Sequence, residues 1–320
     1  MVEFSSSFLN FDFNSIDEYL ASVKEFDLDA IQNSEGIYTN SHQIVNLPKL
    51  QIGLRSMNCA TIHNGVLLQD AYYIVIPKDN CDTYINGKQV GLAQFFIVKP
   101  GEEVSTLFPQ NFSAAIICIP VSSLADCVDE NSLMLLHKSY ELLRLDYLGT
   151  PKFNNLNKKL TTIVNFTVKN YHILSQQSLV DAQESILLTL TQLLFPILDG
   201  MNSIKIKKCN HYEIVKLSLL YLKAKDNHII SIPELAKVCG CSIRNLEYAF
   251  KSILQITPKQ FLIKRRLNMI HKLFCQKNNI MIKDVASSFG IVNVGRFSQD
   301  YYKMFGCYPS ETLAKTKLPS

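Results

Sequence analysis

Apolar and polar residues alternate in short runs between about residue 50 and residue 120. An alternation with a period of two is typical of strands that bury one face. Turn-forming pairs such as Asn64-Gly65 separate the runs. Short strands at this spacing favour a compact antiparallel barrel or sandwich, whereas residues 1–45 predict only one short helix, from about Ile16 to Val23. The predicted strands are Gln51–Met57, Tyr72–Ile76, Thr83–Ile85, Phe95–Lys99, Val104–Phe108 and Ala114–Ile119.

After Pro120 the apolar residues recur at the three- and four-residue spacing of helices. The expected helices are Ser122–Val128, Ser132–Leu145, Asn155–Tyr171 and Ser178–Leu194. The last two are amphipathic, and Ile186 and Leu190 lie on the apolar face of the final one. Two interpretations of these faces stay open: packing within one chain, or a two-helix interface between two copies, through residues 155–194.

One short pattern occurs twice in the C-terminal part of the chain. The copies span Leu235–Pro258 and Val285–Pro309, and each holds an apolar-alanine pair, a glycine, an aromatic residue and a proline in that order. A helix that packs through its alanine, a tight turn at glycine and a second helix with an aromatic anchor is typical of a helix-turn-helix. The sequence therefore predicts two equivalent units, about fifty residues apart.

The local signals around these units predict their helices. Ser231 and Glu234 have the spacing of a capping box, so a helix should begin there. The helix Pro258–Gln276 joins the units, and at roughly 1.5 Å per residue it is about 28 Å long. That length would hold the units near one DNA turn apart, roughly 34 Å. The buried stripes expected on the joining helix and on the preceding helix His211–Ala224 are Ile263, Leu267, Ile270 and Phe274, and Ile214, Leu217, Leu220 and Tyr221.

The expected fold class is α+β with two domains. A small antiparallel β-barrel with a helical segment precedes an all-α double helix-turn-helix. We place a β-rich sensory or regulatory domain at residues 1–121, a helical segment at 122–199, a linker at 200–210 and a DNA-binding domain at 211–320. Within the last domain the two units span about residues 231–254 and 282–305.

Charge is distributed unevenly along the 320 residues, although the net charge is only +4. Residues 1–200 contain 12 Lys and Arg against 21 Asp and Glu, whereas residues 201–320 contain 20 against 7. Each Lys or Arg that neutralises a phosphate releases a counterion, so the basic C-terminal part suits a polyanion such as DNA. The acidic remainder should avoid nucleic acid.

The sequence argues against a membrane protein and against a metalloenzyme. The N-terminus shows no basic region followed by an apolar run, and stretches such as Ser185–Leu198 are too short to span a bilayer. The β-rich region offers only His42 and His63, with no His-x-His pair, and the nine cysteines follow no zinc-binding spacing. We therefore expect a cytoplasmic protein with no membrane contact, no catalytic residues, no metal and no cofactor.

The second helix of each unit carries the side chains that could recognise DNA on its outward face. In the first unit, Arg244 could contact guanine and Glu247 could accept from a cytosine amino group. Tyr248 could pack on a thymine methyl group or bond to a phosphate. An ordinary solvated face is the alternative, and the repeated pattern and the basic charge weigh against it.

The second unit should read fewer bases than the first. Gln299 is its best base reader, towards adenine, while Val294 and Gly295 offer little hydrogen bonding and Asp300 would repel phosphate. Residues of both units should also contact the DNA backbone, which positions a protein on the duplex. These candidates are Ser242, Lys251, Lys259, Asn293, Arg296 and Lys303.

Residues Ser231–Leu313 resemble the C-terminal domain of AraC/XylS-type bacterial transcription regulators over nearly the whole length of that domain. The similarity lies in ELAKVCGCSIRNLEYAFKSILQITPKQFLIKRRL and IKDVASSFGIVNVGRFSQDYYKMFGCYPSETL. The resemblance implies two helix-turn-helix units on a linking helix. Ile291 stands where the family usually has Phe, which changes only a packing detail. By position, the family's base contacts fall on Arg244, Glu247, Tyr248, Val294, Gly295 and Gln299.

A second resemblance concerns the β-rich part. FFIVKPGEEVSTLFPQNFSAAIICIPVSSL, residues 95–124, is similar to the N-terminal domain of the ethanolamine-utilisation regulators, a subgroup of that family. It implies a cupin-like sensory barrel, but it identifies no effector-binding residue.

We interpret the chain as a sequence-specific, DNA-binding transcription regulator, an activator and not an enzyme. Its expected partners are double-stranded promoter DNA, RNA polymerase, a small-molecule effector and a second copy of the chain. Two alternatives stay open. A cupin-like small-barrel enzyme with a regulatory helical domain would need a metal or nucleophile constellation, and stoichiometric iron, zinc or manganese would support it. A helical protein-interaction module would show no steep salt dependence of DNA binding.

Overall fold

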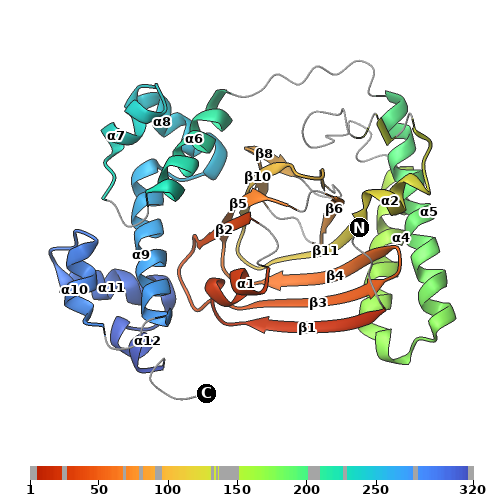
Figure 1. Ribbon diagram of the computed structural model, residues 1–320, viewed down its shortest axis with the longest axis horizontal. Helices are drawn as coiled ribbons and strands as arrows, with labels where there is room; N and C mark the ends of the chain where they lie inside the picture. Colours follow the sequence, from red (N-terminus) through yellow and green to blue (C-terminus); the bar gives the residue numbers. More distant parts are fainter. Residues whose placement is uncertain are drawn as a thin grey trace.

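The computed structural model describes residues 6–23, 27–67, 70–78, 82–90, 96–130, 133–134, 136, 151–200, 210–225, 229–276 and 280–315. The strands occupy the middle of the molecule, with the helices α4 (Pro151–Asn170) and α5 (Gln176–Gly200) on one side (Figure 1). The C-terminal helices lie on the opposite side (Figure 1). The predicted α+β class, β-rich first and helical last, is confirmed.

Within the described residues the strands form two antiparallel sheets. The first sheet contains, in spatial order, β1 (Ser7–Phe13), β3 (Asn40–Leu47), β4 (Leu50–Met57), β11 (Phe112–Pro120), β6 (Ala71–Pro77) and β9 (Phe96–Val98). The second contains β2 (Asp27–Gln32), β5 (Thr61–Val66), β10 (Glu103–Phe108), β7 (Thr83–Ile85) and β8 (Lys88–Val90).

The expected barrel is not closed. No described strand of one sheet pairs with a strand of the other, so the two sheets form a sandwich. An alternating pattern fits both architectures, because each has one inward face. Closure depends on strand tilt and stagger, which the alternation does not encode.

The N-terminal residues before β4 form more strands than the sequence predicted. Besides the expected short helix, which is α1 (Ile16–Ser22), residues 6–47 form β1, β2 and β3, and β5 was also missed. The physical reason lies in what these strands bury. Asn40 and His63 are buried polar residues of β3 and β5, so the interior positions of these strands do not look apolar in the sequence.

The first sheet has two different faces. Leu50, Ile52 and Leu54 of β4 belong to the apolar core that includes residues of α4 and α5. Because neighbouring residues of a strand point to opposite faces, Arg55 and Met57 point into the sandwich. Contacts of Arg55 with Phe108 on the second sheet agree with this placement.

The apolar faces of α4 and α5 were expected either to pack within one chain or to form an interface between two copies. Ile186 and Leu190 are each 0% exposed and pack in the core formed with the first sheet. The expected interface between two copies is therefore wrong for this face. Large apolar side chains on the outer surface are Phe166, Val180 and Leu188. The short helix α2 (Val121–Ala125) precedes α4 and α5 in the chain. The expected helix Ser132–Leu145 and the expected linker 200–210 lie mostly outside the described residues.

The C-terminal helices follow the predicted periodicity with two corrections. Their bounds are α6 (Asn210–Ala224), α7 (Ile232–Val238), α8 (Ile243–Leu254), α9 (Pro258–Gln276), α10 (Ile282–Ser288), α11 (Val294–Phe305) and α12 (Pro309–Lys315). Ile263 is exposed, because Phe261 turns towards Phe250 and fills the core at that end of α9. Leu217 and Leu220 are also exposed. On α6 the buried stripe is Ile214, Val215, Ser218 and Leu222.

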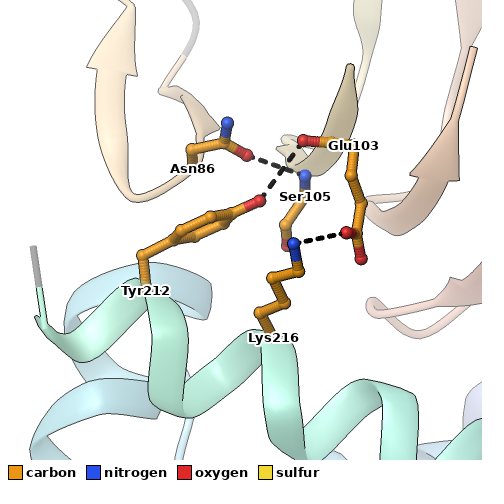
Figure 2. A network of polar contacts seen from close by, with 5 residues as sticks. All are labelled: Asn86, Glu103, Ser105, Tyr212 and Lys216. Carbon is orange, nitrogen blue, oxygen red and sulfur yellow. Dashed lines mark hydrogen bonds and ion pairs between the residues drawn. The ribbon is translucent and has the colours of Figure 1, made fainter. Parts of the chain in front are cut away.

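The outer face of the second sheet packs on the C-terminal helices. Ile31, Ile62 and Leu107 share one apolar core with residues of α6, α7, α8 and α9. Figure 2 shows the polar contacts at this interface: Lys216 Nζ lies 2.6 Å from Glu103 Oε2, and the Tyr212 hydroxyl donates to the Glu103 carbonyl at 3.3 Å. Beside them, Ser105 N donates to Asn86 Oδ1 at 2.9 Å.

Ile186→Asp should destabilise the folded chain and should not simply split a dimer. The change would bury an unpaired carboxylate against the first sheet, at a cost of about 3–5 kcal/mol in the free energy of unfolding. Urea denaturation measures that free energy. The exposed Gln192 of the same helix provides the control, since Gln192→Asp should cost less than about 0.5 kcal/mol. Equal costs for the two variants would contradict the burial of this face.

Candidate nucleic-acid interface

The first helix-turn-helix unit is built from local signals. Ser231 Oγ accepts from Glu234 N at 3.2 Å, and Ser231 N donates to Glu234 Oε2 at 3.4 Å, so the predicted capping box is present. Gly240 follows α7 with φ of +61°, the left-handed conformation that glycine adopts at little cost. Ser242 then caps α8 by accepting from Asn245 N at 3.2 Å.

Helix α8 separates its apolar and polar residues between two faces. Leu246, Ala249, Phe250, Ile253 and Leu254 are buried. Arg244, Glu247, Tyr248 and Lys251 are exposed, as the sequence predicted. The outward face is therefore held in place by a fixed core, which leaves four polar side chains available for a partner.

Two side chains of this outward face orient each other. Arg244 Nη2 donates to the Tyr248 hydroxyl at 3.2 Å, and the guanidinium carbon lies 5.5 Å from the centre of the Tyr248 ring. The two residues are one helical turn apart, where side chains meet on the same face. A guanidinium has five N–H donors, so Arg244 can keep this contact and still present a pair of donors to a guanine edge.

The second unit repeats the design with different outward residues. Gly290 has φ of +69°, and Asn293 caps α11 by accepting from Arg296 N at 2.9 Å. Gly295, Arg296, Gln299 and Lys303 are exposed, whereas Val294 and Asp300 are half-buried. Arg296 Nε lies 3.9 Å from Asp300 Oδ2, so the carboxylate partly offsets the nearest positive charge.

The aromatic anchor of the second unit is tied into a polar network. Tyr301 is fully buried, its hydroxyl donates to Thr312 Oγ1 at 3.0 Å, and His271 Nδ1 lies 2.6 Å from the same hydroxyl. Burial raises the pKa of the Tyr301 hydroxyl, which stays protonated at neutral pH. The network joins α9, α11 and α12, and it thereby fixes the direction of α11.

Helix α9 contributes to the cores of both units. Phe261 belongs to the core of the first unit, and Ile270 and Phe274 belong to the core of the second. At roughly 1.5 Å per residue, its 19 residues span about 28 Å. Figure 1 shows this helix as the connection between the two groups of helices.

Some basic residues near the start of α9 form hydrogen bonds within the molecule and are not available to DNA. Lys264 Nζ donates to the Asn33 carbonyl, and Arg265 Nη2 donates to the Leu222 carbonyl at 2.6 Å. Burial lowers the pKa of Lys264. Both side chains are thus used inside the molecule.

The candidates for backbone contact all lie on the surface: Ser242, Lys251, Lys259, Asn293, Arg296 and Lys303. Ser242 and Asn293 use a side-chain oxygen for capping, which leaves the hydroxyl hydrogen and the amide N–H groups as donors. Helix N-termini with such donors suit phosphate oxygens.

The β-rich part contains a polar cluster that the sequence analysis did not find. Arg55, Asn40 and His63 are buried in the sandwich interior, and each has a side-chain atom without a hydrogen-bond partner. One signal was present in the sequence: Arg55 is the first arginine of the chain and the next is Arg144. An isolated arginine within an apolar alternating strand deserves a structural explanation.

In the described ranges, no group of three His, Cys, Asp or Glu side chains has the arrangement of a metal site. No helix in those ranges is long and apolar enough to cross a membrane.

Comparison with known proteins agrees with the geometry. Residues 235–315 match the family model described as "Helix-turn-helix domain". The probable thc operon regulatory protein of Rhodococcus erythropolis is 31% identical over 102 residues, which cover 31% of this chain and 31% of that protein. XylDLEGF operon transcriptional activator 2 of Pseudomonas putida is 33% identical over 102 residues, covering 31% of this chain and 64% of that protein. The chain thus spans about a third of the first relative's length.

Two solved structures are also similar. A probable AraC family transcriptional regulator from Rhodopseudomonas palustris is 31% identical, covers 33% of this chain and 98% of that chain, and gives a TM-score of 0.31. The AraC-like transcriptional activator CuxR is 13% identical, covers 82% of this chain and 94% of that chain, and gives a TM-score of 0.45.

The C-terminal helices therefore form a DNA-binding domain of the double helix-turn-helix class. Residues 235–315 belong to the AraC-type helix-turn-helix family, as the sequence resemblance implied.

Tyr301→Phe should destabilise the second unit while leaving its outward residues unchanged. Removing the hydroxyl leaves the buried Thr312 Oγ1 and His271 Nδ1 without this partner, at a cost of about 1–3 kcal/mol in the free energy of unfolding. The neighbouring Tyr302 is 46% exposed, so Tyr302→Phe serves as the control and should cost less than about 0.5 kcal/mol. Urea denaturation compares them; equal costs would rule out a stabilising role for the network.

Proposed function

We propose that the chain is a sequence-specific transcription regulator of the AraC/XylS type that activates transcription from promoter DNA. The observation that carries the proposal is the pair of helix-turn-helix units on α9, each with its polar side chains on the outward face of the second helix. The basic C-terminal part supports it, because residues 201–320 contain 20 Lys and Arg against 7 Asp and Glu. RNA polymerase is the partner that an activator of this kind requires, and the cytoplasm is where it would act.

The two units would divide the recognition of bases unequally. Arg244 contacts guanine and Glu247 accepts from a cytosine amino group, with Tyr248 packed against a thymine methyl group. In the second unit, Gln299 reads adenine, while Val294 and Gly295 only allow close approach to the groove. The contacts that position the protein on the phosphates come from Ser242, Lys251, Lys259, Asn293, Arg296 and Lys303.

The β-rich part would regulate this activity by binding a small molecule. It is coupled to the first unit through the apolar core that contains Ile62 and Leu107. It also contacts the second unit, because Gln32 Nε2 donates to the Met304 carbonyl at 2.7 Å. A change in the sandwich can therefore alter the position of both units.

The chain would act as a homodimer through the outer surface of α4 and α5. Phe166 is 57% exposed and Leu188 is 55% exposed, although their helices are otherwise packed on the first sheet. A second copy fits this surface, since apolar helix faces of two copies can cover each other around a two-fold axis. Two DNA half-sites would then be bound by one dimer.

Arg244→Ala should weaken binding to the preferred site by roughly 1–3 kcal/mol and relax specificity at one base pair. The preferred site is first selected from randomised duplex DNA with the unchanged protein, and affinities are then measured on selected and scrambled duplexes at fixed salt. Lys251→Ala is the matched control from the same helix, because loss of a phosphate contact should weaken both duplexes alike and lower the salt slope by about 1. An equal loss on both duplexes for Arg244→Ala would exclude base reading by this residue.

Leu188→Asp should convert a dimer into a monomer without unfolding it. The change places one charge from each copy in the proposed contact, where like charges repel and lose hydration. Light scattering coupled to size exclusion gives the molecular mass, and circular dichroism checks the fold. Lys225→Asp, exposed directly after α6 and outside α4 and α5, should leave the mass unchanged. A monomeric unchanged protein, or a dimeric Leu188→Asp variant, would exclude this interface.

A further inference from the structure

Several polar side chains gather inside the sandwich, around Arg55 of β4. Asn40 of β3 is in direct contact with it, since Arg55 Nε donates to Asn40 Oδ1 at 3.4 Å. His42 of β3 is paired in register with Arg55, and His63 comes from β5 of the opposite sheet. Tyr38 precedes β3, and its buried hydroxyl faces Asn40 and Arg55.

Arg55 is a buried cation without a counter-ion. It is 7% exposed, and among the described residues no carboxylate forms an ion pair with it. Its guanidinium carbon lies 4.4 Å from the centre of the Tyr19 ring and 5.7 Å from that of Phe108. Such ring contacts recover about 2 kcal/mol. Burial of an ion costs several kcal/mol, so the rings alone do not compensate for it.

Four buried atoms of this cluster form no hydrogen bond of good geometry in the structure: Tyr38 Oη, Asn40 Nδ2, Arg55 Nη2 and His63 Nε2. The Tyr38 hydroxyl lies close to the side chains of Asn40 and Arg55 and can satisfy them only in part. All four can donate a hydrogen bond, His63 in the tautomer that carries its proton on Nε2. A single water molecule accepts about two hydrogen bonds, which is fewer than the donors present. A carboxylate has about four acceptor positions and carries no hydrogen of its own.

The charge of the cluster selects a monoanion. Burial lowers the pKa of His42 to about 3, and burial lowers the pKa of His63 well below its ordinary value. The positive charge of Arg55 acts on both rings in the same direction. At neutral pH both imidazoles are therefore neutral, and Arg55 supplies a single positive charge. A doubly charged phosphate would leave one negative charge without a partner.

There is space beside the cluster for the rest of a ligand. A hollow of about 500 Å³ opens to the surface and is lined by Asn40 and by the apolar residues Phe13, Met57 and Phe112. Its other lining residues are polar, and one of them, Asp12, is acidic. Asn40 thus belongs to both the cluster and the hollow. A small molecule could place its carboxylate against the cluster and its apolar part in the hollow.

We propose that Arg55, with Tyr38, Asn40 and His63, binds the carboxylate group of a small monocarboxylic acid inside the sandwich. The assignment of this acid as the effector rests on the proposed function, whereas the binding site itself does not. Strand β5 connects the site to the DNA-binding domain, because His63 points into the sandwich and the adjacent Ile62 packs on the C-terminal helices.

Thermal unfolding of the full chain tests the site without DNA. Sodium acetate and sodium butyrate are titrated in a chloride-free sulfate buffer, against acetamide and sodium chloride, with ionic strength matched for the salts. The melting temperature should rise to a plateau with acetate and butyrate, and should stay unchanged with acetamide. Arg55→Met should abolish the rise and raise the melting temperature of the ligand-free protein, because an unpaired buried charge is lost. Lys169→Met, which removes a positive charge from the exposed surface of α4, should behave like the unchanged chain.

Tyr38→Phe keeps the shape of the ring and should raise the half-saturating acetate concentration about tenfold, so the test stays decisive if Arg55→Met does not fold. An equal response to acetate in the unchanged chain and in the variants that fold would overturn the proposal. Saturation by chloride at the same concentration would identify a site for inorganic anions and would overturn the carboxylate assignment. Either failure would leave binding of DNA by the C-terminal domain untouched, because no DNA enters the measurement.

Discussion

The opposite directions of neighbouring side chains on β5 and β10 determine how the two parts of this molecule communicate. Ile62 and Leu107 enter the core shared with the C-terminal helices, while the adjacent His63 and Phe108 enter the sandwich. Two neighbouring residues of a strand cannot change sides independently, because a one-residue shift moves every side chain to the other face. A rearrangement around His63 therefore acts on the surface that supports α6 and α8. The second sheet thus contacts a candidate ligand site with one face and a DNA-binding domain with the other.

The uneven charge of the chain has a second use besides attraction to DNA. Lys216 pairs with Glu103 at 2.6 Å and Lys223 with Asp27 at 2.5 Å, so basic residues of α6 face acidic residues of the second sheet. These pairs are partly exposed and contribute little to stability. Their value lies in orientation, since opposite charges favour one docking position over others. Some of the basic charge that suggested a polyanion partner thus acts within the molecule.

The sequence predicted the C-terminal half well because its signals are local. A capping residue, a glycine in the left-handed conformation and a helical stripe need only their near neighbours. The capping box of Ser231 and the tight turn at Gly240 are present as predicted. Ile263 shows the limit, since periodicity defines a stripe but does not decide which residue fills the core where a helix meets a second helix. The polar cluster could not be predicted from local sequence signals. Arg55 and His63 belong to different sheets, and only the packing of the two sheets brings them together.

The two helix-turn-helix units differ in how they are held as well as in what they present. Arg244 and Tyr248 orient each other on the first unit, whereas Arg296 of the second unit is partly neutralised by Asp300. The second unit is also tied to the β-rich part by its backbone, because the Met304 carbonyl accepts from Gln32 Nε2 and from Gly36 N. Such contacts fix a helix end whatever the side chains on its outward face. In the proposed function, the first unit would therefore specify bases, and the second would transmit the state of the sandwich to the position of the protein on DNA.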